Sequence, residues 1–171
     1  MSQIIIRDAN VNDFSAIVEI NAAEVIYTSA MDLDRLSLLD SLAAYHRVAV
    51  INQEVVGFLL AMSDNTPYIN DNYNWFSQQY KKFLYIDRIV IKPGYQGQSI
   101  GTTLYKDAIS FAQYSGIPRI TCEIYSTPPN ERSLAFHARL GFREVGKRKL
   151  EITGKSLSMQ EKAVNILDDL S

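Results

Sequence analysis

The chain has 171 residues, with 17 Lys and Arg against 19 Asp and Glu, one cysteine and two histidines. This length is typical of one domain, which buries roughly 70% of the surface of its unfolded chain. The charge balance, without a run of like charges, favours neither nucleic acid nor a membrane surface as a partner. One cysteine excludes an intrachain disulfide and a thiolate metal cluster, and two histidines disfavour a histidine-rich site, so no metal is expected.

The N-terminus offers no targeting signal. Residues 1–8 alternate apolar and charged side chains and lack the basic and apolar regions of a secretory leader. No run of about 18 apolar residues occurs that could cross a membrane. We therefore expect a cytoplasmic protein.

The first third of the chain predicts a strand, two helices and a hairpin. Residues 4–7 are too rich in branched side chains for a helix and indicate a strand. Apolar side chains recur at helical spacing over 14–21 and 33–43, each time behind Asn or Asp capping candidates. Residues 47–51 and 55–62 are joined by three polar residues and predict an antiparallel hairpin.

Residues 63–82 form the least regular segment, rich in asparagine and aromatic side chains. Loops of this length are usually functional or disordered, and the aromatic content argues against disorder. We expect an ordered flap with one helical turn over 74–80. Trp75 and its aromatic neighbours would form either a lid or acceptor wall, or a local core that pins the loop.

The remaining chain predicts further strands and helices. They are a strand over 83–91, a helix from about Ser99 with an apolar face over 100–112, a strand over 120–125, a helix over 130–140, and a hairpin of 142–152 and 156–161. The resulting order is β-α-α-β-β-β-α-β-α-β-β. It indicates a single α/β domain over 1–162, with a mixed, mostly antiparallel central sheet flanked by helices, and a C-terminal tail over 163–171.

A glycine-rich turn over 94–101 leads from the strand into a helix N-terminus. Such a turn presents unpaired N–H groups at the positive end of the helix dipole, where a phosphate can bind. Its glycines at 94, 97 and 101 fit neither the P-loop nor the dinucleotide fingerprint, which disfavours ATP and NAD. By itself the pattern is equally typical of plain turn chemistry.

Two segments, Ile89–Gly101 and Asn130–Phe142, resemble the two signatures of the GCN5-related N-acetyltransferase (GNAT) superfamily. Gln96 and Gly101 match the ends of the first signature, and Ser99 stands where the middle glycine is usual. Serine is small and can cap a helix. The resemblance implies the GNAT fold and acetyl-CoA as cofactor. It implies cofactor contacts from the strand, the loop and the second signature: Ile89, Val90, Ile91, Gln96, Gly97, Gln98, Ser99, Ile100, Gly101, Asn130 and Ser133.

The resemblance also implies two groups for acetyl transfer. In the family, the strand before the phosphate loop bulges and exposes one N–H to the acetyl carbonyl, which here would lie between Ile89 and Ile91, at Val90. Many relatives have a tyrosine acid at the position of His137. A histidine there can donate a proton to the leaving thiolate, or it can be a packed, inert side chain.

Asp87 and Glu123 are the candidates for general base, because each is a carboxylate inside an otherwise apolar strand. In a regular strand Arg88 would face away from Asp87, so the partner of Asp87 would come from elsewhere, and a structural salt bridge is the alternative role. Trp75, Tyr85 and Tyr125 are expected to contact the substrate.

These features predict an N-acetyltransferase that moves an acetyl group directly from acetyl-CoA to a primary amine of a small molecule or peptide. A non-catalytic acyl-CoA-binding regulatory module is the alternative. The resemblance favours a homodimer. No motif selects among amino acids, antibiotics, polyamines and protein N-termini as acceptors.

Overall fold

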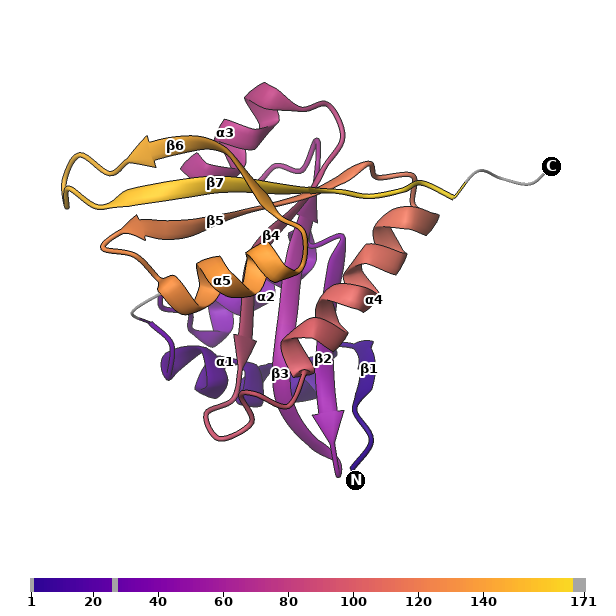
Figure 1. Cartoon of the computed structure of the whole chain (residues 1–171). Coiled ribbons are helices and arrows are strands. Elements are labelled where there is room, and N and C mark those ends of the chain that lie inside the picture. Colours follow the sequence, from indigo (N-terminus) through magenta and orange to yellow (C-terminus); the bar gives the residue numbers. More distant parts are fainter. Residues whose placement is uncertain (1, 26–27, 168–171) are drawn as a thin grey trace.

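The computed structural model describes residues 2–25 and 28–167, which form a seven-stranded sheet flanked by helices (Figure 1). The strands are β1 (Ile5–Asp8), β2 (Tyr45–Ile51), β3 (Glu54–Ser63), β4 (Leu84–Ile91), β5 (Arg119–Thr127), β6 (Arg143–Lys149) and β7 (Ser156–Ala163). The helices are α1 (Phe14–Ala22), α2 (Leu33–Leu42), α3 (Asp71–Gln79), α4 (Ile100–Tyr114) and α5 (Glu131–Arg139), and a 3-10 turn, Val11–Asp13, precedes α1. The spatial order is β1-β2-β3-β4-β5-β7-β6, and only the β4–β5 pair is parallel. The predicted α/β class and mixed, mostly antiparallel sheet are confirmed.

Helices cover both faces of the sheet, and each face has its own core. The side chains of α1, α2 and α3 pack on one face, around Ile17, Leu36 and Phe76. Those of α4 and α5 pack on the other face, around Leu104 and Phe142 (Figure 1). The central strands are therefore buried on both faces, which is why β3 carries an almost unbroken apolar run.

Local sequence signals account for the N-terminal elements. Asn10 forms a capping box with Asp13 at the 3-10 turn, and the side chain of Asp32 accepts a hydrogen bond from the Arg35 amide at the start of α2. The hairpin turns at Asn52 and Gln53, whose φ angles of 49° and 68° are both left-handed. Such a two-residue turn matches the twist of the flanking strands.

The 63–82 segment is more helical than its sequence predicts. The expected single turn is the nine-residue helix α3, which begins behind Asn70, whose side chain accepts hydrogen bonds from the amides of Asn72 and Tyr73. Tyr73 and Phe76 are buried against the sheet. The helix is polar over most of its surface, so burial of these two rings, and not intrinsic helical periodicity, defines it.

The sheet divides at β4 and β5, as Figure 1 shows by the different directions of β2–β4 and β5–β7. These two strands pair only at Leu84 with Ile120 and at Tyr85 with Thr121. Past that point none of the described strands pairs with the β4 edge that faces β5. The last strand, β7, runs to Ala163, and the Val164 amide donates to Pro118 O at 2.9 Å, so ordered packing passes the expected boundary at residue 162.

Candidate active site

A β-bulge in β4 lies at Asp87. Arg88 pairs with Leu60 of β3 and Ile86 pairs with Ala61, which leaves Asp87 as the extra residue. A bulge reverses the alternation of side chains, so Asp87 and Arg88 share a face. The expectation that Arg88 points away from Asp87 is wrong for this reason, and so is the expected bulge between Ile89 and Ile91, where the register is regular.

The two bulge residues form a buried ion pair, with Arg88 Nε 2.8 Å from Asp87 Oδ2. The Arg88 guanidinium also donates to Asn21 Oδ1 at 3.1 Å and to the carbonyl and hydroxyl oxygens of Ser29 at 3.0 and 2.9 Å. The Tyr68 hydroxyl donates to the other Asp87 oxygen. These bonds offset the desolvation of both charges and connect the bulge to the end of α1 and to the 64–69 loop.

Glu123 lies on β5 just beyond the point where the strands part. The Tyr85 hydroxyl is 2.9 Å and 2.7 Å from its two carboxylate oxygens. The pKa of Glu123 is raised to about 8. Burial is the largest cause and the negative charge of Asp87 acts in the same direction, while the hydrogen bonds from Tyr85 oppose the rise. A carboxyl group with this pKa can exchange a proton near neutral pH. Burial also raises the pKa of the Tyr85 hydroxyl well above its usual value, which keeps it a donor.

The glycine-rich loop presents free backbone donors. Among the described residues, no hydrogen bond has an amide of residues 96–102 as its donor, and the first bond of α4 runs from Thr103 N to Ser99 O at 2.9 Å. Gly97 has a left-handed φ of 81° and no atom within 4 Å of a hypothetical Cβ, so its surface is open. These orphan amides at a helix N-terminus fit an anionic pyrophosphate.

Ser99 and Gly101 have different structural roles in this loop. Ser99 has a left-handed φ of 63°, and its side chain does not make the cap that a serine can form at a helix N-terminus. A glycine would adopt this backbone without strain, which explains why glycine is usual there. At Gly101 a Cβ would lie 3.1 Å from the Phe136 ring, so this glycine allows α5 to pack closely on α4.

The free edge of β4 carries the backbone groups of alternate residues. Lys92 N donates to Val56 O at 2.8 Å, which places the N–H and C=O of Lys92 on the β3 side. Backbone groups alternate in direction along a strand, so the N–H and C=O of Val90 also point toward β3. Those of Ile89 and Ile91 point into the gap between β4 and β5. The backbone groups that the resemblance implies for cofactor binding therefore point the right way at Ile89 and Ile91, but not at Val90.

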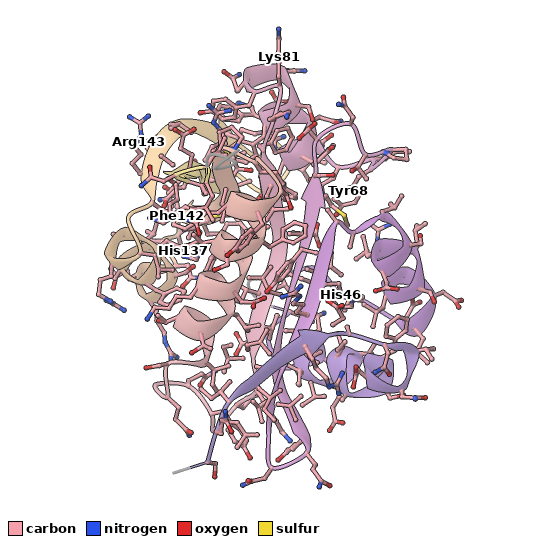
Figure 2. All side chains as sticks on the ribbon, turned by 90° about the vertical axis from the view of Figure 1, so that its right-hand side faces the viewer. His46, Tyr68, Lys81, His137, Phe142 and Arg143 are labelled. Carbon is pink, nitrogen blue, oxygen red and sulfur yellow. The ribbon has the colours of Figure 1, made fainter. Side chains whose placement is uncertain are left out.

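His137 is buried between α4 and α5, beside Phe142 and on the opposite side of the sheet from Tyr68 (Figure 2). Its Nδ1 lies 2.8 Å from the Ser133 carbonyl oxygen and its Nε2 lies 2.7 Å from the Tyr105 hydroxyl. The carbonyl requires a donor, so Nδ1 carries the proton and Nε2 accepts from Tyr105. Burial lowers the pKa of His137, which favours the neutral ring. Both ring nitrogens are thus occupied within the protein.

The other predicted site residues are spread over the molecule. The Asn130 side chain caps α5 by accepting from Ser133 N at 3.3 Å. Tyr125 is partly buried, with the Lys155 ammonium 5.4 Å from its ring centre. Trp75 packs on β6, where a Cβ added to Gly146 would overlap the indole ring. Of the two roles considered for the aromatic flap, this contact favours a local core that pins the segment.

Sequence reasoning missed Tyr68 and Arg88. Arg88 was missed because a regular strand would turn it away from Asp87. It also missed the start of α3, for which Asn70 followed by Asp71, an N-cap with an acidic first turn, was an available signal. Nothing in the sequence connects Tyr68 with Asp87, which lie nineteen positions apart in the chain.

Within residues 2–25 and 28–167, no three His, Cys, Asp or Glu side chains are grouped so that they could hold a metal ion. Over the same residues, no helix has the length and apolarity needed to span a membrane.

Comparison with known proteins identifies the class of this fold and site. The model of the acetyltransferase (GNAT) family matches residues 14–142, and the chain belongs to that family. Acetyl-CoA, the acyl donor of this family, is accordingly its cosubstrate. A comparison with curated protein sequences gave no match.

Among solved structures, the chain is similar to Ard1 from Thermoplasma volcanium, with a TM-score of 0.77 and 13% identity over 95% of this chain and 98% of that one. It is similar to the ribosomal-protein-S18-alanine N-acetyltransferase from Escherichia coli, with a TM-score of 0.74 and 13% identity over 99% of both chains. It is also similar to yncA from Salmonella typhimurium, solved with its cofactor acetyl-CoA, with a TM-score of 0.73 and 20% identity over 99% of both chains. These likenesses confirm the fold.

Proposed function

We propose that this protein is an N-acetyltransferase that moves the acetyl group of acetyl-CoA directly to a primary amine of a small molecule or peptide. The observation that carries the proposal is the position of the Glu123 carboxyl group. It lies where β4 and β5 part, it is bonded to Tyr85, and its pKa is raised to about 8. Amine acetylation needs such a proton acceptor, because only the neutral amine is a nucleophile.

The two carboxylates, Glu123 and Asp87, have different roles. Glu123 is the general base, since its proton affinity is close to that needed at neutral pH. Asp87 is held by Arg88 and Tyr68, and its negative charge raises the pKa of Glu123. Tyr85 donates to Glu123 and fixes the direction of its carboxyl group. In this assignment Asp87 sets the electrostatics of the cleft and Glu123 accepts the proton.

The chain's own backbone holds the cofactor. The free amides of residues 96–102 bind the pyrophosphate, and the cleft-facing groups of Ile89 and Ile91 bind the arm. When bound, acetyl-CoA supplies an activated acetyl group and a thiolate leaving group. The N–H of Ile89 is the first to face the gap after the bulge, so we assign it, in place of Val90, to the acetyl carbonyl.

We assign His137 a structural role, because Tyr105 and Ser133 occupy both of its ring nitrogens. A thiol with an unperturbed pKa of about 8.5 gives a thiolate that can leave without help from an acid. Cys122 is buried, and burial raises the pKa of its thiol, which disfavours a covalent acetyl-enzyme. Both points support direct transfer.

The test is thiol release from acetyl-CoA in the presence of a mixed panel of amines. Peptides belong in the panel because a structural neighbour acts on an alanine of ribosomal protein S18. We expect release with at least one amine class, and Glu123→Gln to lose the rise of the rate with pH through about 8. Tight coenzyme A binding without transfer to any amine would instead support the non-catalytic module. The homodimer and the cytoplasmic location stay predictions.

A further inference from the structure

The buried ion pair of Asp87 and Arg88 is the point where two segments that lie far apart in the chain meet. Both side chains are 4% exposed, which is rare for charged groups. The Tyr68 hydroxyl reaches the pair from the 64–69 loop and donates to Asp87 Oδ1. Ser29 reaches it from the segment before α2, and its carbonyl and hydroxyl oxygens lie 3.0 and 2.9 Å from the guanidinium nitrogens. One ion pair therefore holds both segments.

The guanidinium of Arg88 uses both of its terminal nitrogens to bind the segment before α2. Nη1 donates to Asn21 Oδ1 at 3.1 Å and to Ser29 O, and Nη2 donates to Ser29 Oγ. The Asn21 amide is held as well, because its oxygen accepts from the Thr28 hydroxyl at 3.0 Å and its nitrogen donates to Ser29 O at 3.1 Å. The planar fork of an arginine fits this set of oxygens, whereas a lysine ammonium has neither its shape nor as many donors. Residues 28–29 and the end of α1 are thus bonded to the bulge of β4.

The bulge that this pair holds precedes the amide that we assign to the acetyl carbonyl. Asp87 is the extra residue in the register of β4 with β3, so side-chain bonds hold it in place of a ladder partner. Ile89, two residues further on, pairs with Leu59 and directs its N–H into the gap between β4 and β5. A displacement of Asp87 or Arg88 changes the direction of this N–H, because all three residues belong to one short stretch of strand.

We propose that Arg88 and Tyr68 are positioning residues of the active site: through Asp87 they hold residues 28–29 and the 64–69 loop to the bulge, and the bulge directs the Ile89 N–H. The proposal rests on the proposed function for the role of that N–H alone. Loss of the tyrosine hydroxyl or of the guanidinium should loosen both segments, because both are bonded to the same ion pair.

The first test is amide hydrogen exchange in the full chain without ligands. Tyr68→Phe removes only the hydroxyl group that donates to Asp87. The Thr28 amide, which donates to Glu24 O at 3.0 Å, should then exchange about fivefold faster, the effect of losing a typical hydrogen bond. Among the described residues, no hydrogen bond joins Tyr68 directly to this part of the chain, so the effect has to pass through the ion pair.

The matched control for this test is Tyr45→Phe. It removes another buried tyrosine hydroxyl that donates to an aspartate, Asp107, at 2.6 Å, on the opposite face of the sheet. The control should leave exchange at Thr28 unchanged. The reverse experiment is Ser29→Ala, which should speed exchange at the amide of Tyr68, the other segment of the network.

The second test is chemical rescue of Arg88→Ala. The truncation leaves a site lined by oxygens of Asp87, Asn21 and Ser29, which a free guanidinium ion fits. The measurement is the carbon-13 signal of acetyl-CoA labelled at the acetyl carbonyl and bound without an acceptor, because a hydrogen bond from the Ile89 N–H shifts that signal. Arg88→Ala should lose most of the shift. Millimolar guanidinium chloride should restore it, and sodium chloride at the same concentration should not.

The matched control for the rescue is Arg47→Ala, which removes an arginine paired with Asp8 and Asp107 elsewhere on the sheet. It should keep the full carbonyl shift with and without guanidinium. The Kd of coenzyme A should stay close to that of the parent protein in Arg88→Ala, because the pyrophosphate binds to the amides of residues 96–102 and not to the bulge.

Unchanged exchange at Thr28 in Tyr68→Phe would overturn the link between the two segments, as would an equal rise in Tyr45→Phe. A carbonyl signal that is the same in Arg88→Ala as in the parent protein would overturn the positioning role, and so would a loss that guanidinium does not reverse. If Arg88→Ala does not fold, Tyr68→Phe carries the expectation of a reduced carbonyl shift. Neither measurement requires an acceptor, so a protein that binds acetyl-CoA and acetylates no amine would overturn the proposed function and leave this proposal to be judged on exchange and carbonyl shift.

Discussion

At the scale of single residues, the carboxyl group of Glu123 has a strongly raised pKa. Its surroundings exclude water and Asp87 adds negative charge, while hydrogen bonds from Tyr85 offset part of the cost of ionisation. A group held this way is expensive to ionise in the folded state. This cost of ionising Glu123 affects the free energy of unfolding as well as catalysis.

Glu123→Gln should make the protein more stable relative to its parent as the pH rises. The pKa of Glu123 is about 8 in the folded protein against an ordinary value of 4.5, so between these pH values the folded state keeps a proton that the unfolded state has lost. The unfolding free energy contributed by this group therefore falls as the pH rises through that window, and glutamine cannot contribute this slope. Thermal melts at pH 5 and pH 8 give the measurement. A difference in Tm that is the same at both pH values would contradict the pKa.

Ser99→Gly should stabilise the protein by about 1 kcal/mol, because it relieves a side chain held at left-handed φ. That gain corresponds to about 2–4 °C in Tm for a chain of this size. Ser99→Ala keeps the Cβ and should leave Tm unchanged, since the serine side chain does not cap the helix. A marked loss of stability in Ser99→Ala would show that the hydroxyl makes a contact after all.

At the scale of elements, α3 joins the two parts of the divided sheet. It packs on the central strands through Tyr73 and Phe76 and on β6 through Trp75. Trp75 can pack this closely on β6 because residue 146 is a glycine, and any Cβ there would overlap the indole ring. The flap is thus a structural bridge between the two parts of the sheet.

Gly146→Ala should destabilise the protein by about 1–3 kcal/mol, the usual cost of overpacking. Denaturant melts measure the loss, and the fluorescence of Trp75, the only tryptophan, should move to longer wavelength as the ring is displaced toward water. Trp75→Phe in the same background should recover most of the loss by making room. Gly146→Ala with unchanged stability and emission would show that Trp75 does not pin α3 to β6.

At the scale of the whole molecule, the cofactor would connect parts that the sheet leaves apart. The phosphate loop follows β4, whereas α5 follows β5, and these strands share only two paired positions. A ligand that contacts both sides stabilises the folded state by mass action. Its effect on Tm therefore reports on the loop.

Coenzyme A at about 100 times its Kd should stabilise the protein by about 2.7 kcal/mol. Differential scanning fluorimetry should then show a Tm higher by about 6–10 °C. Gly97→Ala places a Cβ on a left-handed residue in the open loop and should reduce this increase at the same ligand concentration. An equal increase in the variant would remove the loop from the cofactor site.

The sequence by itself determined most of the elements, the mixed sheet and the glycine-rich turn before α4. These depend on signals carried by neighbours in the chain, namely hydrophobic period, capping residues and a glycine turn before a helix. The capping residue Asp32 and the turn at Asn52 and Gln53 are local in this sense. So is the positive φ at Gly97, since backbone freedom belongs to the residue.

The tertiary structure alone decided how the site is assembled. The bulge at Asp87 comes from the register between β3 and β4, which no pattern within β4 encodes, and it turned Arg88 from an expected outward residue into the partner of Asp87. The hydrogen bonds of His137 with Tyr105 and of Tyr85 with Glu123 join elements far apart in the chain. A pKa or a hydrogen bond depends on what folding brings within a few ångströms, and that follows from packing and not from sequence distance.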